Sequence, residues 1–508
     1  MPAEIEFRRA GQEDAGRVRE LTRKAYAKWC DVIGREPLPM AADYDRAVRR
    51  HVIDLAYRSG RLSGLVEMIP RDGDLLIENV CVDPGEQGRG LGRRLVARAE
   101  EEASARGYAA IRLYTNKLFA GNLRFYAGLG YQIEREQPFK GGIMVHFRKV
   151  LDMSVDHRFM VLAARLGHRS LGTTARNPAV GCVIVNDGTI VGLGWTQAGG
   201  RPHAETEALA MAGEKARGAT AYVTLEPCAH HGRTAPCAEA LAAARVARVV
   251  TAFEDPDPRV SGRGFAILQQ AGIAVDTGIG VAAARPALAG FLTRIVKKRP
   301  YVTLKLALSA DGKIAAAPGR RTAITGPEVK ARTHRRRAEA DAILVGIGTV
   351  LADDPDLTCR LPGLESRSPV RVVADSHLAI PEVSHLVKTA GQVPVWLLSL
   401  SAGTLAPGVD VLACRPDRQG RVDLADALGK LAARGINRVL AEGGARLARG
   451  LVEGGLVDEL LIFRSPRIMG PEGVDGFARL PFDQVMAAFR PEGEERLGDD
   501  VLSVYVPA

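Results

Sequence analysis

The most constraining feature of this chain is a set of histidine, glutamate and cysteine residues in its middle third. His203 and Glu205 lie two positions apart, and Cys228 and Cys237 follow with eight residues between them. One histidine and two cysteines provide three of the nitrogen and sulfur ligands that zinc prefers, and a catalytic zinc ion leaves its fourth position to water. Glu205, at the start of an expected helix, can face that water without binding the metal and can transfer its proton to a leaving amine. The spacing therefore predicts a catalytic zinc site with Glu205 as its acid and base.

A second interpretation of this pattern is a structural zinc site, which requires four protein ligands. His230 or His231, which follow Cys228 closely, could supply the fourth ligand. The loop between the cysteines also carries Arg233 and Thr234, which could hold a phosphate or a ribose. The order His-x-Glu, Pro-Cys, Cys is typical of zinc deaminases that act on bases, and this favours the catalytic interpretation.

The length of 508 residues predicts about three domains of ordinary size. A charged strand end followed by Met153 marks a first junction, and a basic cluster that ends at Pro300 marks a second. The expected domains are residues 1–150, 153–298 and 299–508. Strands alternate with helices in each of them, so the expected fold class is mixed α/β throughout.

The hydrophobic periodicity predicts the main elements of each domain. In the first domain we expect strands at 65–69, 75–82 and 111–115 and helices at 90–106 and 120–129. In the second we expect helices at 156–166 and 204–212 and another from 237, with strands at 181–185, 189–194 and 221–225. In the third we expect helical stretches between strands at 301–307, 342–345, 370–374, 395–398 and 438–441.

The composition excludes several classes of protein. The seven cysteines are too sparse for a disulfide scaffold and suit a reducing compartment. Charged residues interrupt the N-terminus where a signal peptide needs an apolar run, and the longest apolar stretch, near 342–352, is too short to span a membrane. The net charge of +10 suits anionic small ligands, while an aromatic content of 5% gives little support for nucleic-acid binding. We therefore expect a cytoplasmic protein, and its charge suits an anionic small ligand at least as well as nucleic acid.

The metal-site motif extends into a longer pattern that resembles a known family. The runs NPAVGC at 177–182 and TLEPCAHHGRTAPC at 224–237 are similar to the deaminase half of the bifunctional riboflavin-biosynthesis deaminase/reductases. The resemblance implies a cytidine-deaminase-like zinc domain that hydrolyses the 2-amino group of 2,5-diamino-6-(5-phosphoribosylamino)pyrimidin-4-one. It also implies that Asn177, His230 and Arg233 contact this substrate.

Markers of the reductase half of the same family continue toward the end of the chain. They include KLALSADGK at 305–313, TVLADDPDLTCR at 349–360 and EGG at 442–444. The strand expected at 438–441 runs into these glycines and then into a helix, which lets backbone N–H groups approach a pyrophosphate at the helix start. The resemblance implies a dihydrofolate-reductase-like domain that uses NADPH to reduce the ribosyl group to a ribityl chain.

The family pattern also implies roles for individual residues of this half. The residues expected to bind the NADPH cofactor are Thr349, Asp353, Ser376, Gly443 and Gly444. The residues expected to bind the substrate are Arg337, Leu357, Arg360 and Glu442. The chain departs from the family at 321–325, where it has RTAIT and the family often has Ser-x-Trp-Ile-Thr. A relative adapted to a flavin-like natural product therefore stays an alternative.

Residues 1–150 resemble a different family. The run QGRGLGRR at 87–94 stands between an expected strand and an expected helix, where its N–H groups would surround a pyrophosphate. Together with NLRFYAGLGY at 122–131, it resembles acetyltransferases of the GNAT superfamily, which use acetyl-CoA. The resemblance implies that Tyr126 is the general acid for the leaving thiolate and that Glu78 is the base. The residues expected to bind the cofactor are Val82, Gln87, Gly88, Arg89, Gly90, Gly92 and Asn122.

Several alternatives remain open on the sequence. Tyr126 could belong to the core, Glu78 could be a solvated strand residue, and the first domain could bind CoA or a partner without catalysing a transfer. The zinc domain could act on a base in nucleic acid, although the loop suited to phosphate and the attached reductase argue against this. The sequence predicts a multifunctional enzyme that uses zinc, NADPH and acetyl-CoA. It leaves the acetyl acceptor and the association of identical chains open.

Overall fold

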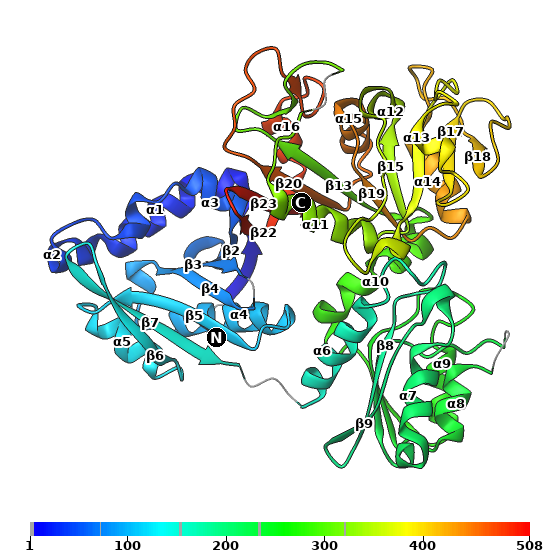
Figure 1. The fold of residues 1–508 in the computed structure, drawn as a ribbon. Coiled ribbons are helices and arrows are strands. Elements are labelled where there is room, and N and C mark those ends of the chain that lie inside the picture. The colour runs from blue at the N-terminus through cyan, green and yellow to red at the C-terminus, as the bar shows by residue number, and fades with distance from the viewer. Residues whose placement is uncertain (1–4, 72, 152–154, 232–234, 320–321) are drawn as a thin grey trace. The chain divides into compact units, whose positions relative to one another are not determined.

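The chain is divided into two compact units in a computed structural model. The structure describes residues 5–71, 73–151, 155–231, 235–319 and 322–508. The first unit contains residues 1–153 with 486–495 and 503–508, and the second contains residues 154–485 with 496–502. Helices pack on sheets in both units (Figure 1), so the mixed α/β fold class predicted from the sequence is confirmed.

The first unit is built on a seven-stranded sheet with the order β1-β2-β3-β4-β5-β7-β6. Its strands are β1 (Ile5–Arg9), β2 (Val52–Arg58), β3 (Arg61–Pro70), β4 (Leu75–Val82), β5 (Ala110–Asn116), β6 (Gln132–Phe139) and β7 (Gly142–Val150). Its helices are α1 (Ala15–Tyr26), α2 (Cys30–Ile33), α3 (Tyr44–Arg50), α4 (Leu91–Ala105) and α5 (Ala120–Ala127). Neighbouring strands are antiparallel except for β4 and β5, which are parallel.

The parallel pair of β4 and β5 opens a gap in this sheet. Residues 75–77 pair with 111–113, and along the rest of both strands, all of it within the described residues, the two strands do not pair with each other. The strands therefore diverge toward their C-terminal ends. Helix α4 covers the sheet through Leu91, Leu95 and Ala99, each of which is at most 1% exposed.

The second unit contains two main sheets. The first has the order β12-β11-β10-β8-β9, with β8 (Gly181–Asn186), β9 (Thr189–Trp195), β10 (Thr220–Leu225), β11 (Arg248–Phe253) and β12 (Ala274–Asp276). Its helices are α6 (Val155–His168), α7 (Ala204–Ala212), α8 (Cys237–Ala243), α9 (Arg263–Gln270) and α10 (Val281–Lys297). Figure 1 shows α6 and α10 on one face of the sheet and α7, α8 and α9 on the other. Buried residues of all five helices and of the strands form one hydrophobic cluster.

The second main sheet is parallel along the seven strands that lie wholly in this unit. Their order is β18-β17-β16-β15-β19-β13-β20. These strands are β13 (Tyr301–Leu308), β15 (Ala342–Gly346), β16 (Val370–Ala374), β17 (Val395–Ser399), β18 (Val409–Ala413), β19 (Arg438–Ala441) and β20 (Glu459–Arg464). The helices are α11 (Pro327–Ala338), α12 (Ile347–Asp353), α13 (His385–Lys388), α14 (Leu424–Ala433), α15 (Ala445–Glu453) and α16 (Phe482–Met486). The remaining strands are β14 (Lys313–Ala315), β21 (Val474–Asp475), β22 (Phe489–Leu497) and β23 (Asp500–Pro507).

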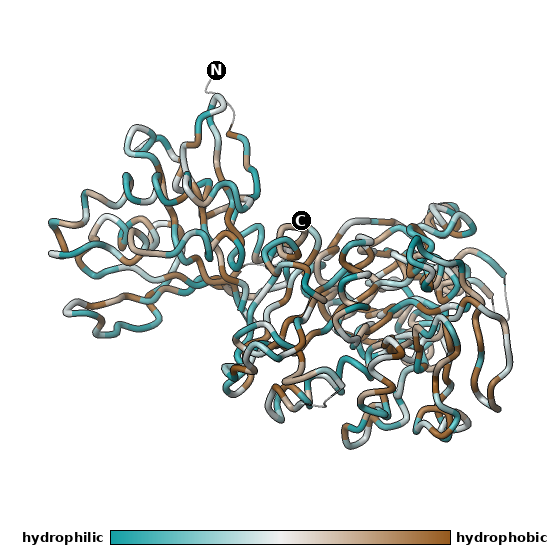
Figure 2. The backbone as a smooth tube through the Cα atoms, turned by 90° about the horizontal axis from the view of Figure 1, so that it is seen from above, coloured by the Kyte–Doolittle hydropathy of each residue, from teal (hydrophilic) through white to brown (hydrophobic). Residues whose placement is uncertain are grey.

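The predicted elements agree best where the burial pattern is regular, which is alternating in β4, one-sided in α7 and continuous over 439–441 in β19. The strands predicted at 75–82 and 438–441 and the helix predicted at 204–212 have the observed bounds of β4, β19 and α7. Strand β6 was not predicted, because nearly all of it is exposed and it has no buried face to produce a periodic pattern. Figure 2 shows hydrophobic stretches inside the units and hydrophilic residues along outer loops. Among the described residues, no helix combines the length and apolar content that a membrane span requires.

Candidate metal centre and ligand sites

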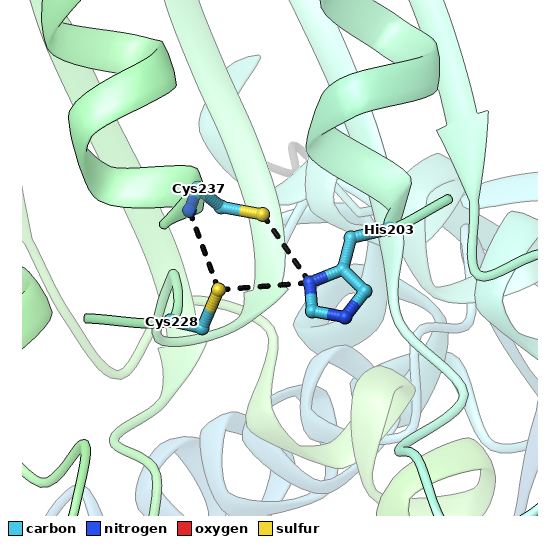
Figure 3. Close-up of side chains that lie close together, drawn as sticks. All are labelled: His203, Cys228 and Cys237. Carbon is cyan, nitrogen blue, oxygen red and sulfur yellow. Dashed lines mark hydrogen bonds between the residues drawn. The ribbon is translucent and has the colours of Figure 1, made fainter. Parts of the chain in front are cut away.

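The three predicted metal ligands lie together near the starts of two helices (Figure 3). His203 is the N-cap residue of α7, Cys237 is the first residue of α8, and Cys228 lies three residues after β10. His203 Nδ1 is 3.6 Å from Cys228 Sγ and 3.3 Å from Cys237 Sγ. The backbone N–H of Cys237 donates to Cys228 Sγ at 3.3 Å. The strand, the loop and the two helices thus bring both sulfurs to one histidine nitrogen.

This arrangement fits a zinc ion. Tetrahedral zinc with bonds of roughly 2.0 to 2.3 Å holds its ligand atoms about 3.5 Å apart, which is close to both sulfur–nitrogen distances. Nδ1 of His203 faces the sulfurs, so Nδ1 would be the ligand atom. Within the described part of the chain, the group that could hold a metal consists of His203, Cys228 and Cys237 alone. Three protein ligands leave a position for water, as in a catalytic site.

The alternative of a structural zinc site with a fourth histidine ligand is not supported. His231 Nε2 lies 3.0 Å from Glu239 Oε1, and the His231 side chain is 73% exposed. His230 is also outside the metal-binding group. Arg233 and Thr234, predicted to hold substrate, lie outside the described residues.

Glu205 has the environment that its predicted role requires. It lies in the first turn of α7 and is 4% exposed. Burial, together with the sulfur of Cys228, raises the pKa of its carboxyl to about 7. A carboxyl with a pKa near neutrality can both accept and donate a proton at physiological pH. The role of Glu205 as proton carrier stays a prediction that this environment suits.

Asn177, a predicted substrate contact, lies against the segment that leads into His203. Its backbone N–H donates to Thr174 O at 3.1 Å, and Thr174 Oγ1 donates to Asn177 O at 2.8 Å. A Cβ atom at Gly200 would lie 1.9 Å from Asn177 Nδ2. Only glycine therefore allows the loop around Asn177 to approach the backbone three residues before the metal ligand.

A second group of predicted residues meets at the end of β19. Arg337 Nε lies 2.7 Å from Glu442 Oε1 and Arg337 Nη2 lies 3.0 Å from Glu442 Oε2. Arg337 Nη1 also donates to Thr358 O at 2.9 Å, which brings the 357–360 segment to the same place. Burial opposes ionisation of Glu442, but the Arg337 guanidinium outweighs it and the pKa of the carboxyl is lowered. The pair is therefore charged at neutral pH.

Arg360 and Leu357 differ within this segment. The Arg360 guanidinium lies 2.7 Å from Asp356 Oδ2, and the Arg360 backbone N–H donates to His334 Nδ1 at 3.1 Å. The Leu357 side chain is 3% exposed and belongs to the core cluster under β15 and β16. The buried side chain does not support a substrate contact of its own, so the role of Leu357 stays a prediction.

Two titratable residues beside this group were not predicted as site residues. Burial lowers the pKa of Lys305, and the charge of Glu442 opposes that shift. Burial also lowers the pKa of His334 to about 4. Lys305 stands between Leu304 and Leu306 on the buried strand β13. A charge in the middle of an apolar strand is the signal that could have identified it.

The residues predicted to bind NADPH lie partly together. Gly444 is the N-cap residue of α15, and a Cβ atom there would be 3.6 Å from Thr349 Oγ1. Asp353 is the last residue of α12. The hydroxyl of Ser376, just after β16, accepts the backbone N–H of Val422 at 3.0 Å. Thr349 therefore lies beside the start of α15, and Gly443 directly precedes the N-cap residue of that helix. The N-terminus of a helix suits a pyrophosphate.

The first unit contains a cavity with about 700 Å³ of free space, partly open to solvent, where β4 and β5 diverge. Residues of β4, β5, α5 and the β6–β7 hairpin line it. Both predicted catalytic residues, Glu78 and Tyr126, line this cavity, and so does Asn122. The residues predicted to act together are therefore brought to one place.

Glu78 reaches the cavity through a β-bulge. The neighbouring residues 67–68 of β3 lie opposite residues 79 and 77 of β4, so Glu78 is the extra residue. The Tyr114 hydroxyl donates a hydrogen bond to its carboxylate. Burial raises the pKa of Glu78 above its ordinary value. Glu78 is thus half-buried and hydrogen-bonded, which does not support the alternative of a freely solvated strand residue.

Tyr126 belongs to the cavity wall and to the core. It is 8% exposed, and its ring centroid lies 5.2 Å from that of Phe125 and 6.0 Å from those of Tyr131 and Phe147. Burial raises the pKa of Tyr126, which keeps its hydroxyl protonated at neutral pH. The packing agrees with the core alternative and the protonated hydroxyl agrees with a general acid. The role of Tyr126 therefore stays a prediction.

The predicted pyrophosphate loop connects β4 to α4. Gly90 is the N-cap residue of α4 with a φ of 81°, a conformation that favours glycine. Gln87 Nε2 donates to Val82 O at 3.1 Å, which holds the start of the loop. Arg89 Nη1 lies 3.5 Å from Glu86 Oε1 at the surface. Gly88, between them, also has a positive φ.

Gly92 and Asn122 connect this loop with α5. A Cβ atom at Gly92 would lie 3.5 Å from the ring of Phe125. Asn122 Nδ2 donates to Thr115 Oγ1 at 3.3 Å, next to the gap between β4 and β5. The two runs that carried the family resemblance therefore adjoin in the folded unit.

Three families of known proteins match successive parts of the chain. Residues 300–503 match the family model of the RibD C-terminal domain. Residues 153–253 match the cytidine and deoxycytidylate deaminase zinc-binding region, and residues 17–131 match the acetyltransferase (GNAT) family. Each match falls inside one of the three domains predicted from the sequence.

The chain is also similar to curated proteins named riboflavin biosynthesis protein RibD. It is 43% identical to that of Escherichia coli over 338 residues, which cover 64% of this chain and 91% of the relative. A solved RibD structure from Acinetobacter baumannii is 37% identical, has a TM-score of 0.64 and covers 70% of this chain and 99% of its own. A Thermotoga maritima structure described as a diaminohydroxyphosphoribosylaminopyrimidine deaminase/5-amino-6-(5-phosphoribosylamino)uracil reductase is 34% identical, with a TM-score of 0.63 and coverage of 70% and 99%.

The matches cover 91% to 99% of the length of these relatives, and this chain is longer than each of them. The family matches account for the extra length, because the acetyltransferase match precedes the two others. Both resemblances read from the sequence motifs are confirmed. This chain belongs to the RibD family of riboflavin-biosynthesis deaminase/reductases and carries, before that part, a domain of the acetyltransferase (GNAT) family.

Proposed function

We propose that the second unit catalyses two consecutive steps on a phosphorylated diaminopyrimidinone. The first step is hydrolytic deamination of 2,5-diamino-6-(5-phosphoribosylamino)pyrimidin-4-one, and the second is reduction of the ribosyl group by NADPH. The observation that carries this proposal is the group of His203, Cys228 and Cys237 beside the buried Glu205, in a chain 43% identical to a RibD protein. The description of the Thermotoga maritima relative supports the same two reactions.

In the deamination step, the three ligand residues would hold a zinc ion, which when bound acidifies a water molecule. Glu205 accepts the proton of this water and delivers it to the 2-amino group, which leaves as ammonia. One C–N bond is replaced by one C–O bond, and water is the only other reactant. Asn177, His230 and Arg233 bind the substrate in this proposal.

In the reduction step, Thr349, Asp353, Ser376, Gly443 and Gly444 would hold NADPH, which when bound supplies a hydride. The residues that bind the ribosyl substrate are Arg337, Arg360 and Glu442, with the backbone of Leu357. The ribosyl group gains the hydride and one proton as it becomes a ribityl chain. Lys305, which interacts electrostatically with Glu442, is an acid available in this cluster.

Mass spectrometry of the diaminopyrimidinone after incubation with the full chain tests both steps. With enzyme alone, we expect the mass of the substrate to change by replacement of an amino group with oxygen. With NADPH added, we expect a further gain of two hydrogens. An unchanged substrate in the presence of zinc-loaded enzyme would contradict the deaminase assignment. Deamination without the second change would contradict the reductase assignment.

The first unit, in this proposal, transfers the acetyl group of acetyl-CoA to an amine. Residues 87–92 and Val82 hold the pyrophosphate and the neighbouring part of CoA with backbone donors, assisted by the start of α4. Glu78 takes a proton from the attacking amine, the amine forms a bond to the thioester carbonyl, and the C–S bond breaks. Tyr126 then donates its proton to the leaving thiolate. The observation that supports this proposed acetyl transfer is that Glu78, Tyr126 and Asn122 line one cavity.

Calorimetry of the full chain with acetyl-CoA, followed by a thiol-release assay with a panel of small amines, tests this activity. We expect saturable binding and thiol release that depends on an amine. Binding without release for any amine would favour a non-catalytic CoA-binding module. The absence of binding would leave only a role in interaction with other molecules.

A further inference from the structure

The loop at 169–177 joins α6 to the first sheet of the second unit and carries Asn177. Gly199 N–H donates to Thr173 O at 2.8 Å, and Asn177 lies against Gly200, so one side of the loop adjoins the backbone leading to His203. The loop therefore lies beside the segment that leads into the metal ligand His203.

The other side of the loop is hydrogen-bonded to the second main sheet of this unit, which contains β13 and β15 to β20 and is called the reductase sheet below. Asn437, directly before β19, donates from Nδ2 to Ala175 O at 2.9 Å and to Asn177 O at 3.3 Å. Arg294 of α10 donates from Nη2 to Arg176 O at 2.7 Å and from Nε to Asn437 Oδ1 at 2.6 Å. Three consecutive carbonyl groups of the loop are thus bound by two side chains that also bind each other.

Asn437 is itself fixed in the reductase sheet. It is 6% exposed, its backbone N–H donates to Asp341 Oδ2 at 2.8 Å, and its carbonyl accepts the Tyr301 N–H at 2.9 Å. The next residue, Arg438, also donates its backbone N–H to Asp341 Oδ2 at 2.8 Å. Strand β19 starts here and ends directly before Glu442, which with Arg337 and residues 357–360 forms the group that we call the reductase cluster.

The packing around these hydrogen bonds leaves little freedom. Gly435 has a φ of 93°, and a Cβ atom there would lie 2.9 Å from Arg176 Cβ. Ala175 has a φ of 53°, in a region that residues with a side chain seldom adopt. Such a conformation persists only where the surroundings hold it, and the bond from Asn437 to Ala175 O is one such restraint.

We propose that Asn437 is a positioning residue for the deaminase, so that a residue of the reductase sheet sets the affinity of the zinc site for its substrate. This inference rests on the proposed function, in which Asn177 contacts the substrate. An asparagine suits the position because its amide provides an acceptor for Arg294 and two donors for the loop carbonyls. The reductase sheet thereby keeps the substrate loop in its strained, binding-competent form.

The isosteric variant Asn437→Asp tests the proposal in the full chain. It retains an acceptor for Arg294 but places an oxygen opposite the carbonyls of Ala175 and Asn177. The two hydrogen bonds from residue 437 to the loop are therefore lost. We expect the KM for deamination to rise about tenfold, the size expected when hydrogen bonds that order a loop are lost. We expect zinc content, deaminase kcat and the reductase KM for NADPH to change less than about twofold.

Arg434→Ala is the matched control. Arg434 lies three residues before Asn437, and its guanidinium forms an exposed ion pair with Asp410 at 2.7 Å, so its loss should leave the KM for deamination unchanged. If Asn437→Asp does not fold, Asn437→Ser retains one hydroxyl donor and should raise the KM by a smaller factor.

Four readouts decide the outcome: ammonia release for deamination, NADPH oxidation with pre-deaminated substrate, metal analysis and thermal unfolding. A folded, zinc-loaded Asn437→Asp with wild-type KM would overturn the proposal. Equal losses in both activities would also overturn it, because they would indicate a general structural role. A wild-type chain that binds zinc but releases no ammonia would instead refute the proposed function itself.

Discussion

The zinc site of the second unit and the cavity of the first unit are built in opposite ways. The zinc site is defined by three ligand atoms and one carboxylate, all of them on or next to the starts of α7 and α8. The cavity of the first unit is a space between diverging strands, and many ordinary side chains line it. The metal site depends on the identity of a few residues, whereas the cavity depends on shape.

This difference determines how well each site can be understood. Zinc accepts few ligand types at fixed distances, so the geometry of three residues already limits the chemistry. An organic acceptor is selected by the form of its whole binding surface. Glu78 and Tyr126 lie on one surface of the cavity. Variants of both sites test this difference.

Removing a metal ligand should have the largest effect. Cys228→Ser should lose the zinc ion and reduce deamination by at least ~10³-fold, because the water is no longer acidified. NADPH oxidation with pre-deaminated substrate should continue, because the reductase cluster lies on another sheet. Metal analysis and ammonia release measure both effects. Cys30→Ser, the same change in a cysteine of the first unit, is the control and should retain zinc. Retained zinc and activity in Cys228→Ser would refute the ligand assignment.

A substitution in the predicted pyrophosphate site of the reductase should have the next largest effect. Gly444→Val should weaken NADPH binding by about 100-fold in a fluorescence titration, because a branched side chain would occupy the space beside the helix start. A Cβ atom at Gly444 would lie 3.6 Å from Thr349, an ordinary contact, so the fold should persist. Gly443→Ala provides a contrast, because its Cβ would lie 2.4 Å from Leu447 and should lower the stability. Unchanged NADPH affinity in Gly444→Val would place the cofactor elsewhere.

Tyr126→Phe separates the two interpretations of this residue. If its hydroxyl is the general acid, acetyl transfer should slow roughly 10- to 100-fold while the affinity for acetyl-CoA is unchanged. The phenylalanine ring retains the packing against Phe125, Tyr131 and Phe147. Thiol-release assays measure the rate of acetyl transfer, and calorimetry measures the affinity for acetyl-CoA. A variant with wild-type turnover would show that Tyr126 serves only the core.

The pH dependence of acetyl transfer should report the protonation of Glu78. The expected change in rate is smaller than for the variants above. Burial raises the pKa of this carboxyl, and a base acts only after it has lost its proton. The rate should therefore fall as the pH is lowered through a pKa above that of an exposed glutamate. Glu78→Gln should reduce the rate about tenfold and remove this acidic limb. An acidic limb that persists in Glu78→Gln would assign it to another group.

The sequence predicted the parts of the fold that have a regular burial pattern or a required residue type. Strand β4, helix α7 and strand β19 were obtained with their observed bounds, and the metal ligands lie together as the spacing of His203, Cys228 and Cys237 indicated. The family resemblance implied a shared substrate role for Arg337 and Glu442, 105 residues apart, but the ion pair between them is seen only in the structure. No local pattern links two side chains so distant in the chain.

The sequence could not predict features that arise from shape. Glu78 reaches the cavity because a bulge shifts the register between β3 and β4, and no residue type marks that bulge. The segment at 33–39 and strand β6 also line the cavity, although β6 is nearly all exposed and has no periodic apolar pattern. Asn437 was missed because its importance comes from partners on other elements, whereas Lys305 had a local signal, a charge within an apolar strand, that was not used. The domain boundaries at 1–150, 153–298 and 299–508 stay predictions.

The most direct test of this account is the Glu205→Gln variant of the full chain, measured for zinc content and ammonia release together. Glutamine preserves the size of the side chain in α7 but cannot carry a proton. The account predicts about one zinc per chain, as for the wild type, with deamination reduced ~10³-fold and NADPH oxidation with pre-deaminated substrate unchanged. Loss of the metal in this variant, or deamination at the wild-type rate, would contradict the role assigned to Glu205.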